Sequence, residues 1–273
     1  MEGSVINQIC ASMDSFFDTE KKIGDYIVRN PQKVVDMTVG ELAKECGVSE
    51  ASVSRFCKRI ELKGFHHLKI SLARELVDAK DEGEISGHIS VDDIDGSLRG
   101  ILSNKMEELR QTVAMIDRGE LKKILEVINN ADTVLMAAVG NTIPVAMDGA
   151  YKLNQIGIRA VSTPIWETEL GYSYNMTDKD VVIAISNSGE STGVIQILEA
   201  AKNRGAVTIS ITNSDKSSVA EMSTYHITTA TREKLFLDGY CFSRVSATMV
   251  VEMIYLLLAS MRKESYESIV RHE

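Results

Sequence analysis

Cysteine is scarce in this chain of 273 residues, and its placement excludes several classes of protein. The four cysteines show no C-x-x-C spacing, and the histidines form no pair with the spacing of metal ligands. We therefore expect reduced thiols, without a disulfide framework or a metal site. The pattern G-x-G-x-x-G is also missing, so the sequence gives no indication of a dinucleotide, and we expect no cofactor.

Long hydrophobic runs are missing as well. The longest apolar stretch, residues 245–261, is interrupted by Ser246, Thr248 and Glu252, which favours a buried helix over a membrane span. The N-terminus shows no signal-peptide pattern. Apolar residues make up 44% of the chain and charged residues 25%, as in ordinary globular proteins. The sequence therefore predicts a cytoplasmic protein that has no membrane partner.

The chain has fewer basic than acidic residues: 30 Lys and Arg against 39 Asp and Glu, which gives a net charge of −9. The deficit is not uniform, because residues 1–80 carry 12 basic and 12 acidic side chains. Residues 49–74 hold six basic side chains against two acidic ones. A locally basic module joined to an acidic body is typical of a DNA-binding domain attached to a sensory domain.

Residues 38–59 have the features of a helix-turn-helix motif. Thr38 and Glu41 have the T-x-x-E spacing of a capping box, so a helix is expected to start there. Gly47 can adopt the left-handed conformation of a tight turn, and Ser49 can cap a second helix. Two amphipathic helices with so short a connection are typical of this DNA-binding motif.

The second helix of this motif is expected to present polar side chains outward. Serine and arginine there can contact base edges in a major groove, and the basic residues near its end can contact phosphates. A helical bundle with a solvated charged face is the alternative interpretation. We favour DNA binding, and the predicted DNA-binding residues are Ser49, Glu50, Ser52, Ser54, Arg55, Lys58, Arg59 and Lys63.

Strand and helix patterns alternate in the second half of the chain. This alternation predicts a doubly wound α/β domain with a parallel sheet. We therefore expect an all-α helix-turn-helix head over residues 1–80, an acidic linker over residues 81–95 and an α/β domain over residues 96–273. The expected strands lie near residues 133–139, 158–162, 181–185, 207–212 and 225–228.

Polar loops follow two of these strands. One loop precedes an amphipathic helix and contains Ser186, Asn187, Ser188, Gly189, Ser191 and Thr192. A strand that ends at such a loop and continues as a helix presents free N–H groups and the positive end of a helix dipole to an anion. The other loop contains Gly140, Asn141 and Thr142. Each loop alone fits an ordinary turn, but together they indicate a cleft for a polar ligand, because ligands bind at the carboxyl ends of such strands.

Both halves of the chain resemble one known family. SNSGES at residues 186–191, followed by a helix and by GAVTISIT at residues 205–212, resembles the sugar isomerase (SIS) domain. AVGNTIPVAMDGAYKLNQIGI at residues 138–158 resembles the first strand, loop and helix of that domain. ELAKECGVSEASVSRFCKRIELKGF at residues 41–65 is similar to the helix-turn-helix of RpiR-type transcriptional regulators, which join such a head to an SIS domain.

The resemblance implies a set of residues that contact a phosphorylated sugar. The chain departs from the family pattern at Gly193, where an acidic residue often stands, and at Glu61, where a glycine usually ends the recognition helix. In isomerases of this fold a glutamate or histidine moves the proton between C1 and C2, and Glu233 and His226 lie in a comparable region. The implied sugar-binding residues are Gly140, Asn141, Thr142, Ser186, Asn187, Ser188, Gly189, Ser191, Thr192 and Glu233.

These features predict a transcriptional regulator, not an enzyme, whose operator affinity is controlled by a phosphorylated sugar. We expect a homodimer or homotetramer on a palindromic operator. The apolar helix from about Tyr240 to Met261 is a candidate for a subunit interface or for burial within one subunit. Two alternatives remain: an aldose–ketose phosphosugar isomerase with an appended DNA-binding head, and a DNA-binding protein whose body only dimerises.

Overall fold

The structure, a computed structural model, describes residues 4–80, 89–231 and 244–262. The chain forms two compact units. Among the described residues, one unit contains those up to Arg110 together with Ala230 and Thr231, and the other contains residues 111–229 and 244–262. This division falls inside helix α7 (Ile94–Met115). The linker and domain limits drawn from the sequence stay a proposal, since residues 81–88 lie outside the described residues.

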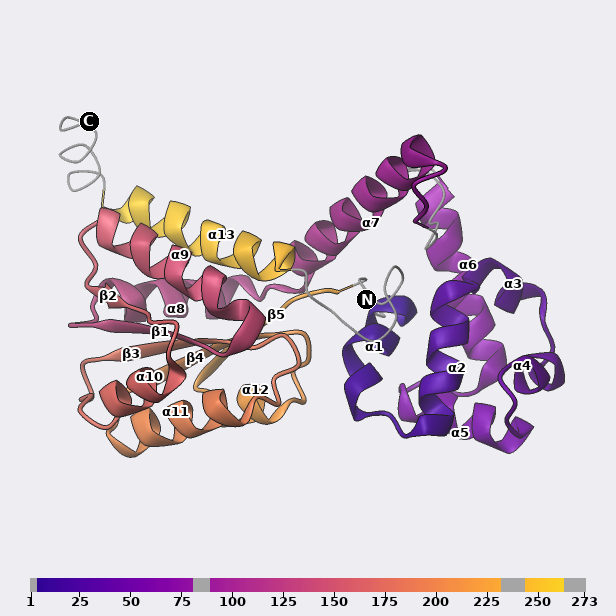
Figure 1. Cartoon of the computed structure of the whole chain (residues 1–273), viewed down its shortest axis with the longest axis horizontal. Coiled ribbons are helices and arrows are strands. Elements are labelled where there is room, and N and C mark those ends of the chain that lie inside the picture. The colour runs from indigo at the N-terminus through magenta and orange to yellow at the C-terminus, as the bar shows by residue number, and fades with distance from the viewer. Residues whose placement is uncertain (1–3, 81–88, 232–243, 263–273) are drawn as a thin grey trace. The chain divides into compact units, whose positions relative to one another are not determined.

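The first unit is built from helices in its described residues, as predicted for the head (Figure 1). One apolar core holds it together, and Phe56 is among the largest of its fully buried side chains. The helices before α7 are α1 (Val5–Ser12), the short 3-10 helix η1 (Met13–Ser15), α2 (Asp18–Arg29), α3 (Pro31–Asp36), α4 (Val39–Glu45), α5 (Glu50–Arg59) and α6 (Phe65–Lys80).

The second unit contains a parallel sheet of five strands in the order β2-β1-β3-β4-β5. The chain enters the sheet at β1, adds β2 on one side and then β3, β4 and β5 on the other, so the predicted doubly wound α/β fold is confirmed. The strands are β1 (Val134–Ala138), β2 (Ala160–Val161), β3 (Val181–Ile185), β4 (Val207–Thr212) and β5 (Tyr225–Thr228).

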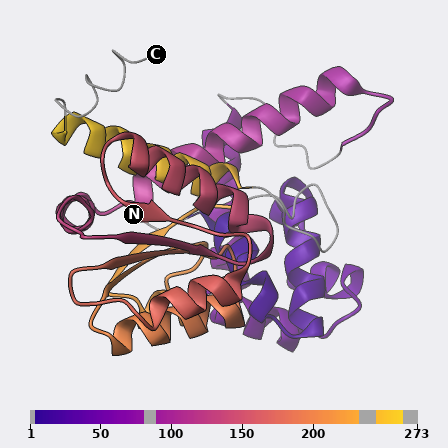
Figure 2. The ribbon, with the colours of Figure 1, turned by 60° about the vertical axis from the view of Figure 1, so that its left-hand side comes forward.

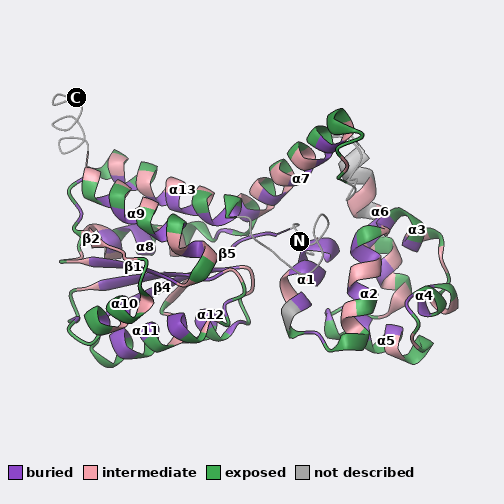
Figure 3. Cartoon of the chain, in the orientation of Figure 1, coloured by how far each residue is buried: buried purple, intermediate pink, exposed green. Residues whose placement is uncertain are grey.

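Helices cover both faces of this sheet (Figures 1 and 2). Figure 3 shows the strands buried between helices whose outer faces are exposed. Burial on both faces explains why β1 and β3 are unbroken apolar runs. One face carries α8 (Arg118–Asn129), α9 (Ile143–Gln155) and α13 (Val245–Met261), and the other carries α10 (Trp166–Ser173), α11 (Thr192–Asn203) and α12 (Ser218–Met222).

Helix α13 contains the longest apolar run of the sequence. It packs on α8 and α9 through buried side chains that include Val250, Ile254 and Leu258. Its outer face leaves Leu256 and Leu257 with 56% and 40% of their surface exposed. The first part of the predicted helix, residues 240–243, lies outside the described residues. None of the helices in the described ranges is both long and apolar enough to cross a membrane.

Candidate functional site

Helices α4 and α5 begin with the predicted caps, and the turn between them has the predicted backbone conformation. Thr38 Oγ1 accepts from the Glu41 N–H at 3.2 Å, and Glu41 Oε2 accepts from the Thr38 N–H at 2.7 Å, so the capping box is confirmed. These bonds to Thr38 lower the pKa of the Glu41 carboxyl group. Gly47 has a φ of 64°, and Ser49 Oγ caps α5 by accepting from the Ser52 N–H at 3.2 Å.

Helix α5 separates apolar and polar side chains cleanly. It buries Val53, Phe56 and Cys57 completely. Arg55 is exposed, and its Nη2 donates to Ser52 Oγ at 3.3 Å. The other predicted DNA-binding side chains that are exposed are Ser49, Glu50, Ser54, Lys58, Arg59 and Lys63, while Ser52 is half-buried. The outward face therefore carries the residues expected of it, and their contact with DNA stays a prediction.

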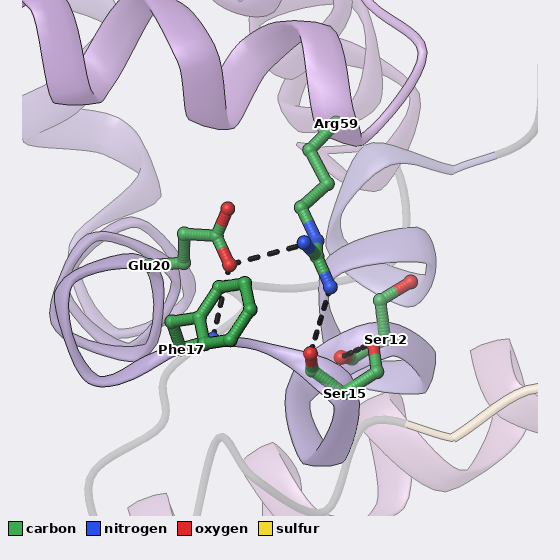
Figure 4. Close-up of polar contacts among 5 residues, drawn as sticks. All are labelled: Ser12, Ser15, Phe17, Glu20 and Arg59. Atoms are coloured by element: carbon green, nitrogen blue, oxygen red, sulfur yellow. Dashed lines mark hydrogen bonds and ion pairs between the residues drawn. The ribbon is translucent and has the colours of Figure 1, made fainter.

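Arg59, at the end of α5, has partners within the head (Figure 4). Its Nη2 donates to the Ser15 carbonyl at 2.8 Å, and its Nε lies 3.5 Å from Glu20 Oε2. The guanidinium carbon also lies 5.2 Å from the centroid of the Phe17 ring. These contacts join α5 to the start of α2, a role that the sequence did not indicate. A phosphate contact by Arg59 would compete with them.

The loop between β3 and α11 is fixed in a tight turn. Ser186 is buried, and its Oγ accepts from the Gly189 N–H at 3.2 Å. Gly189 has a φ of 70°, and a Cβ there would lie 2.1 Å from Ser217 Oγ, so only glycine fits. The Gly189 carbonyl accepts from the Val219 N–H at 2.9 Å, which ties the loop to α12. The loop is therefore held in place before any ligand binds.

Helix α11 begins without a side-chain cap. Ser191 is its N-cap residue but makes no capping bond. Among the described residues the N–H groups of Thr192, Gly193 and Val194 have no partner, and the hydroxyls of Ser188, Ser191 and Thr192 donate to none. Free donors at the positive end of a helix dipole form an anion-binding site. The predicted loop therefore has the geometry of an anion seat.

The loop after β1 lies beside this seat. Thr142 is buried, and its Oγ1 donates to the Ile185 carbonyl at 2.9 Å, which joins this loop to the end of β3. Gly140 has a φ of 69°, and no atom lies within 4 Å of the position of a Cβ there. Arg244, which the sequence analysis missed, donates to the Asn141 carbonyl at 3.2 Å. The fold therefore brings the two predicted loops together and adds a cation.

A buried carboxylate supports the first loop, and no sequence pattern indicated it. Glu169 of α10 is fully buried, and its Oε2 accepts from the Ala138 N–H at 3.1 Å. Its Oε1 accepts from the Thr163 N–H at 3.0 Å. Burial raises the pKa of this carboxyl group, although its hydrogen bonds act in the opposite direction. Glu169 replaces the strand partner that β1 lacks beyond the two residues of β2.

Of the two predicted base candidates, His226 is described by the structure, and it does not lie at these loops. His226 is on β5, two strands from β3. Its Nδ1 lies 2.9 Å from Ser210 Oγ and its Nε2 lies 3.0 Å from Thr228 Oγ1. Burial lowers the pKa of His226. Glu233 lies outside the described residues. Across the ranges that the structure covers, no group of three metal-ligating side chains occurs.

Comparison with known proteins identifies both halves of the chain. The SIS domain matches residues 127–257, and the helix-turn-helix domain of the rpiR family matches residues 3–79. An uncharacterized HTH-type transcriptional regulator of Caldanaerobacter subterraneus is 32% identical over 94% of this chain and 90% of its own length. The chain belongs to the rpiR family of transcriptional regulators. A second regulator, YbbH of Bacillus subtilis, is 30% identical to this rpiR-family protein over 92% of the chain and 87% of the relative.

Two solved structures resemble this rpiR-family regulator. The Vibrio vulnificus NanR protein, complexed with ManNAc-6P, is 25% identical, with a TM-score of 0.58 over 98% of this chain and 96% of its own. The sugar isomerase domain of an RpiR transcription factor from Sphaerobacter thermophilus is also 25% identical, with a TM-score of 0.58 over 63% and 94%. The predicted family, fold and regulatory role are therefore confirmed.

Proposed function

We propose that this rpiR-family regulator binds a phosphorylated sugar at the carboxyl ends of β1 and β3, and that the sugar controls its affinity for operator DNA. The uncapped N-terminus of α11, with the hydroxyls of Ser188, Ser191 and Thr192, carries the proposal. A phosphate group accepts from such donors and is stabilised by the helix dipole. The complex of NanR with ManNAc-6P supports this assignment.

Within this proposal the predicted residues have separate roles. The phosphate lies on Ser188, Ser191 and Thr192, while the open space at Gly140 leaves room for the sugar. Asn141 and Asn187 bring amide groups to the same edge, and the Asn187 carbonyl accepts from the Asn213 N–H at 2.9 Å. The residues that hold the loops in shape rather than touch the ligand are Ser186, Gly189 and Thr142.

The head would bind the operator through the outward face of α5. A sugar that favours one arrangement of the heads changes their affinity for DNA. A coupling free energy of about 1–3 kcal/mol between the two sites would change operator affinity about 5- to 150-fold. We propose a homodimer or homotetramer on a palindromic operator with half-sites about 34–36 Å apart or a multiple of that spacing. The exposed Leu256, Leu257 and Met261 of α13 supply an apolar surface for subunit contact.

The same site would not act as an isomerase. Proton transfer between C1 and C2 requires a free base beside the sugar. Among the described residues the candidate is His226, which lies on β5 with both ring nitrogens engaged with hydroxyl groups. Glu233 lies outside the described residues, and its substitution is part of the test. The test is incubation of the full chain with a panel of aldose and ketose phosphates, followed by product analysis. Interconversion that disappears in Glu233→Gln would overturn the proposal in favour of an enzyme.

A thermal-shift screen tests the phosphosugar assignment. Hexose, pentose and amino-sugar phosphates are compared with the unphosphorylated sugars, and only phosphorylated ligands are expected to raise the Tm. Ser188→Ala should weaken the active ligand about tenfold or more, since it removes a hydrogen bond to a charged group. Ser260→Ala is the matched control, because Ser260 is exposed on α13 and donates to the Leu257 carbonyl at 2.7 Å.

Two results of this screen would count against the proposal. Equal shifts by phosphorylated and unphosphorylated sugars would exclude the anion seat. If no phosphosugar raised the Tm, and Ser188→Ala left DNA binding and its response to sugars unchanged, the second unit would serve only for subunit association.

A further inference from the structure

A tryptophan contacts both loops of the proposed sugar site. Trp166 is the only tryptophan of the chain and the first residue of α10. A Cβ on Gly193, in the first turn of α11, would lie 3.0 Å from both Cδ2 and Cε3 of the indole and 3.0 Å from Val139 Cγ2. The indole therefore packs on the first turn of α11 and beside the residue that follows β1.

This contact accounts for the glycine at position 193. A Cβ there would lie closer to the indole than in most real Cβ contacts, so the ring or the helix would have to shift by a few tenths of an ångström. Gly193 and Trp166 thus form a matched pair at the start of α11. The indole of Trp166 occupies the space that a side chain at position 193 of α11 would otherwise fill.

Within the described part of the chain, part of the Trp166 indole has no packing or hydrogen-bond partner. Trp166 is only partly buried, and its Nε1–H has no hydrogen-bond partner among the residues that the structure describes. A tryptophan in a protein core normally finds a partner for this group. A partly exposed ring with a free donor, packed against the first turn of α11 where the anion seat lies, is suited to a ligand with an apolar face and hydroxyl groups.

We propose that Trp166 is the stacking platform for the sugar ring and that it makes the site select a closed-ring sugar phosphate over an open-chain one. This proposal rests on the proposed function. A closed pyranose ring presents a contiguous face of C–H groups to the indole, while its hydroxyls reach the Nε1–H. An open-chain polyol has no persistent face and loses more rotational freedom when it is ordered.

Selection of the closed ring also separates sensing from turnover. Isomerisation between C1 and C2 requires the open-chain carbonyl form of the sugar. A site that holds the ring closed binds the phosphosugar without exposing that carbonyl, so occupancy follows the concentration of the ligand rather than its conversion.

Locked analogues test the proposal on the full chain. The closed-ring probes are 1,5-anhydroglucitol 6-phosphate and 1,5-anhydromannitol 6-phosphate, and the open-chain probes are glucitol 6-phosphate and mannitol 6-phosphate. Calorimetry should show at least one closed-ring probe binding about tenfold tighter than its open-chain partner and than inorganic phosphate. The same closed-ring probe should change the emission of Trp166, whereas inorganic phosphate should leave it nearly unchanged.

Two variants separate the aromatic face from simple packing volume. Trp166→Phe keeps an aromatic ring and should retain the preference for the closed ring within about threefold, whereas Trp166→Leu should reduce it about 2- to 12-fold. Both variants should bind inorganic phosphate as the wild type does, which also reports on folding. If Trp166→Leu does not fold, Gly193→Ala displaces the indole by a few tenths of an ångström and should reduce the same preference.

The outcomes separate this proposal from the one on which it rests. Two results would overturn the stacking role of Trp166 but leave the proposed phosphosugar sensor intact. One is phosphosugar binding without a preference for the closed ring. The other is a preference that survives in Trp166→Leu or Gly193→Ala. Binding of inorganic phosphate alone would overturn the platform too. Failure of every phosphorylated probe to bind would overturn both.

Discussion

Glu61 occupies a backbone conformation that favours glycine. Its φ is 62°, and it is the sole non-glycine residue with a positive φ in the described parts of the chain. Its N–H donates to the Lys58 carbonyl at 3.1 Å, and the Leu62 N–H donates to the Cys57 carbonyl at 2.8 Å, the bonding pattern of a helix that ends at a left-handed residue. We therefore expect a glutamate at this position to cost stability relative to a glycine.

Glu61→Gly should raise the free energy of unfolding by about 1 kcal/mol, because glycine adopts the left-handed conformation without the steric cost of a Cβ. Urea denaturation of the full chain measures the change. Ala51→Gly, at an exposed position within α5, is the control and should lower stability by up to about 1 kcal/mol. A loss of stability in Glu61→Gly would show that the glutamate side chain contributes more than its backbone costs.

At the scale of elements, one arginine satisfies the ends of two helices. Arg262 follows α13, and its Nε donates to Asn129 Oδ1 at 2.7 Å while its Nη2 donates to the Asn129 carbonyl at 2.6 Å, at the end of α8. Its Nη1 donates to the Gly157 carbonyl at 3.1 Å, just beyond α9. The last carbonyls of a helix lack partners within it, and a positive charge there is favoured by the helix dipole.

Arg262→Ala should lower the free energy of unfolding by about 2 kcal/mol, since carbonyls at both helix ends lose a charged donor. Arg262→Lys should restore only part of this loss, because one ammonium group cannot reach both helices. Arg159→Ala is the matched control, since Arg159 is exposed, and its effect should stay within about 0.5 kcal/mol. Equal effects of Arg262→Ala and Arg159→Ala in urea denaturation would contradict the capping role.

At the scale of the whole molecule, the chain joins two units with separate cores, and the proposed DNA-binding and sugar-binding sites lie in different units. The outward face of α5 belongs to the first unit, and the loops after β1 and β3 belong to the second. Variants in one unit should therefore change one activity and leave the intrinsic activity of the other intact. Only the response of DNA binding to sugar requires both units.

Arg55→Ala should weaken operator binding about 5- to 150-fold, because an arginine contact to a base is worth about 1–3 kcal/mol, and should leave stabilisation by sugar phosphate unchanged. Fluorescence anisotropy with labelled operator measures the first quantity and thermal shift the second. Lys179→Ala, on the exposed surface of the second unit, makes the same charge change as a control. Loss of both activities in Arg55→Ala would mean that Arg55 is structural.

The local parts of this protein followed from its sequence. The caps at Thr38 and Ser49 and the turn at Gly47 depend on residues within three or four positions, so their patterns were sufficient. Strands β3, β4 and β5 were predicted with their observed bounds. The bounds of β3 were the simplest to read, because a strand buried on both faces of a sheet is an unbroken apolar run. The positions of the two loops that we propose as the sugar site were also predicted from the sequence, since each lies where a strand ends and a helix begins.

Only the tertiary structure decided which distant groups meet. From the sequence, Arg59 was predicted to contact a DNA phosphate. In the fold its guanidinium group donates to the Ser15 carbonyl and pairs with Glu20 of the head. Glu169 and Trp166 had the pattern of an ordinary helix, yet they support the end of β1 and the start of α11. Periodicity and caps report on neighbours along the chain, whereas the partner of a long side chain depends on how separate elements pack.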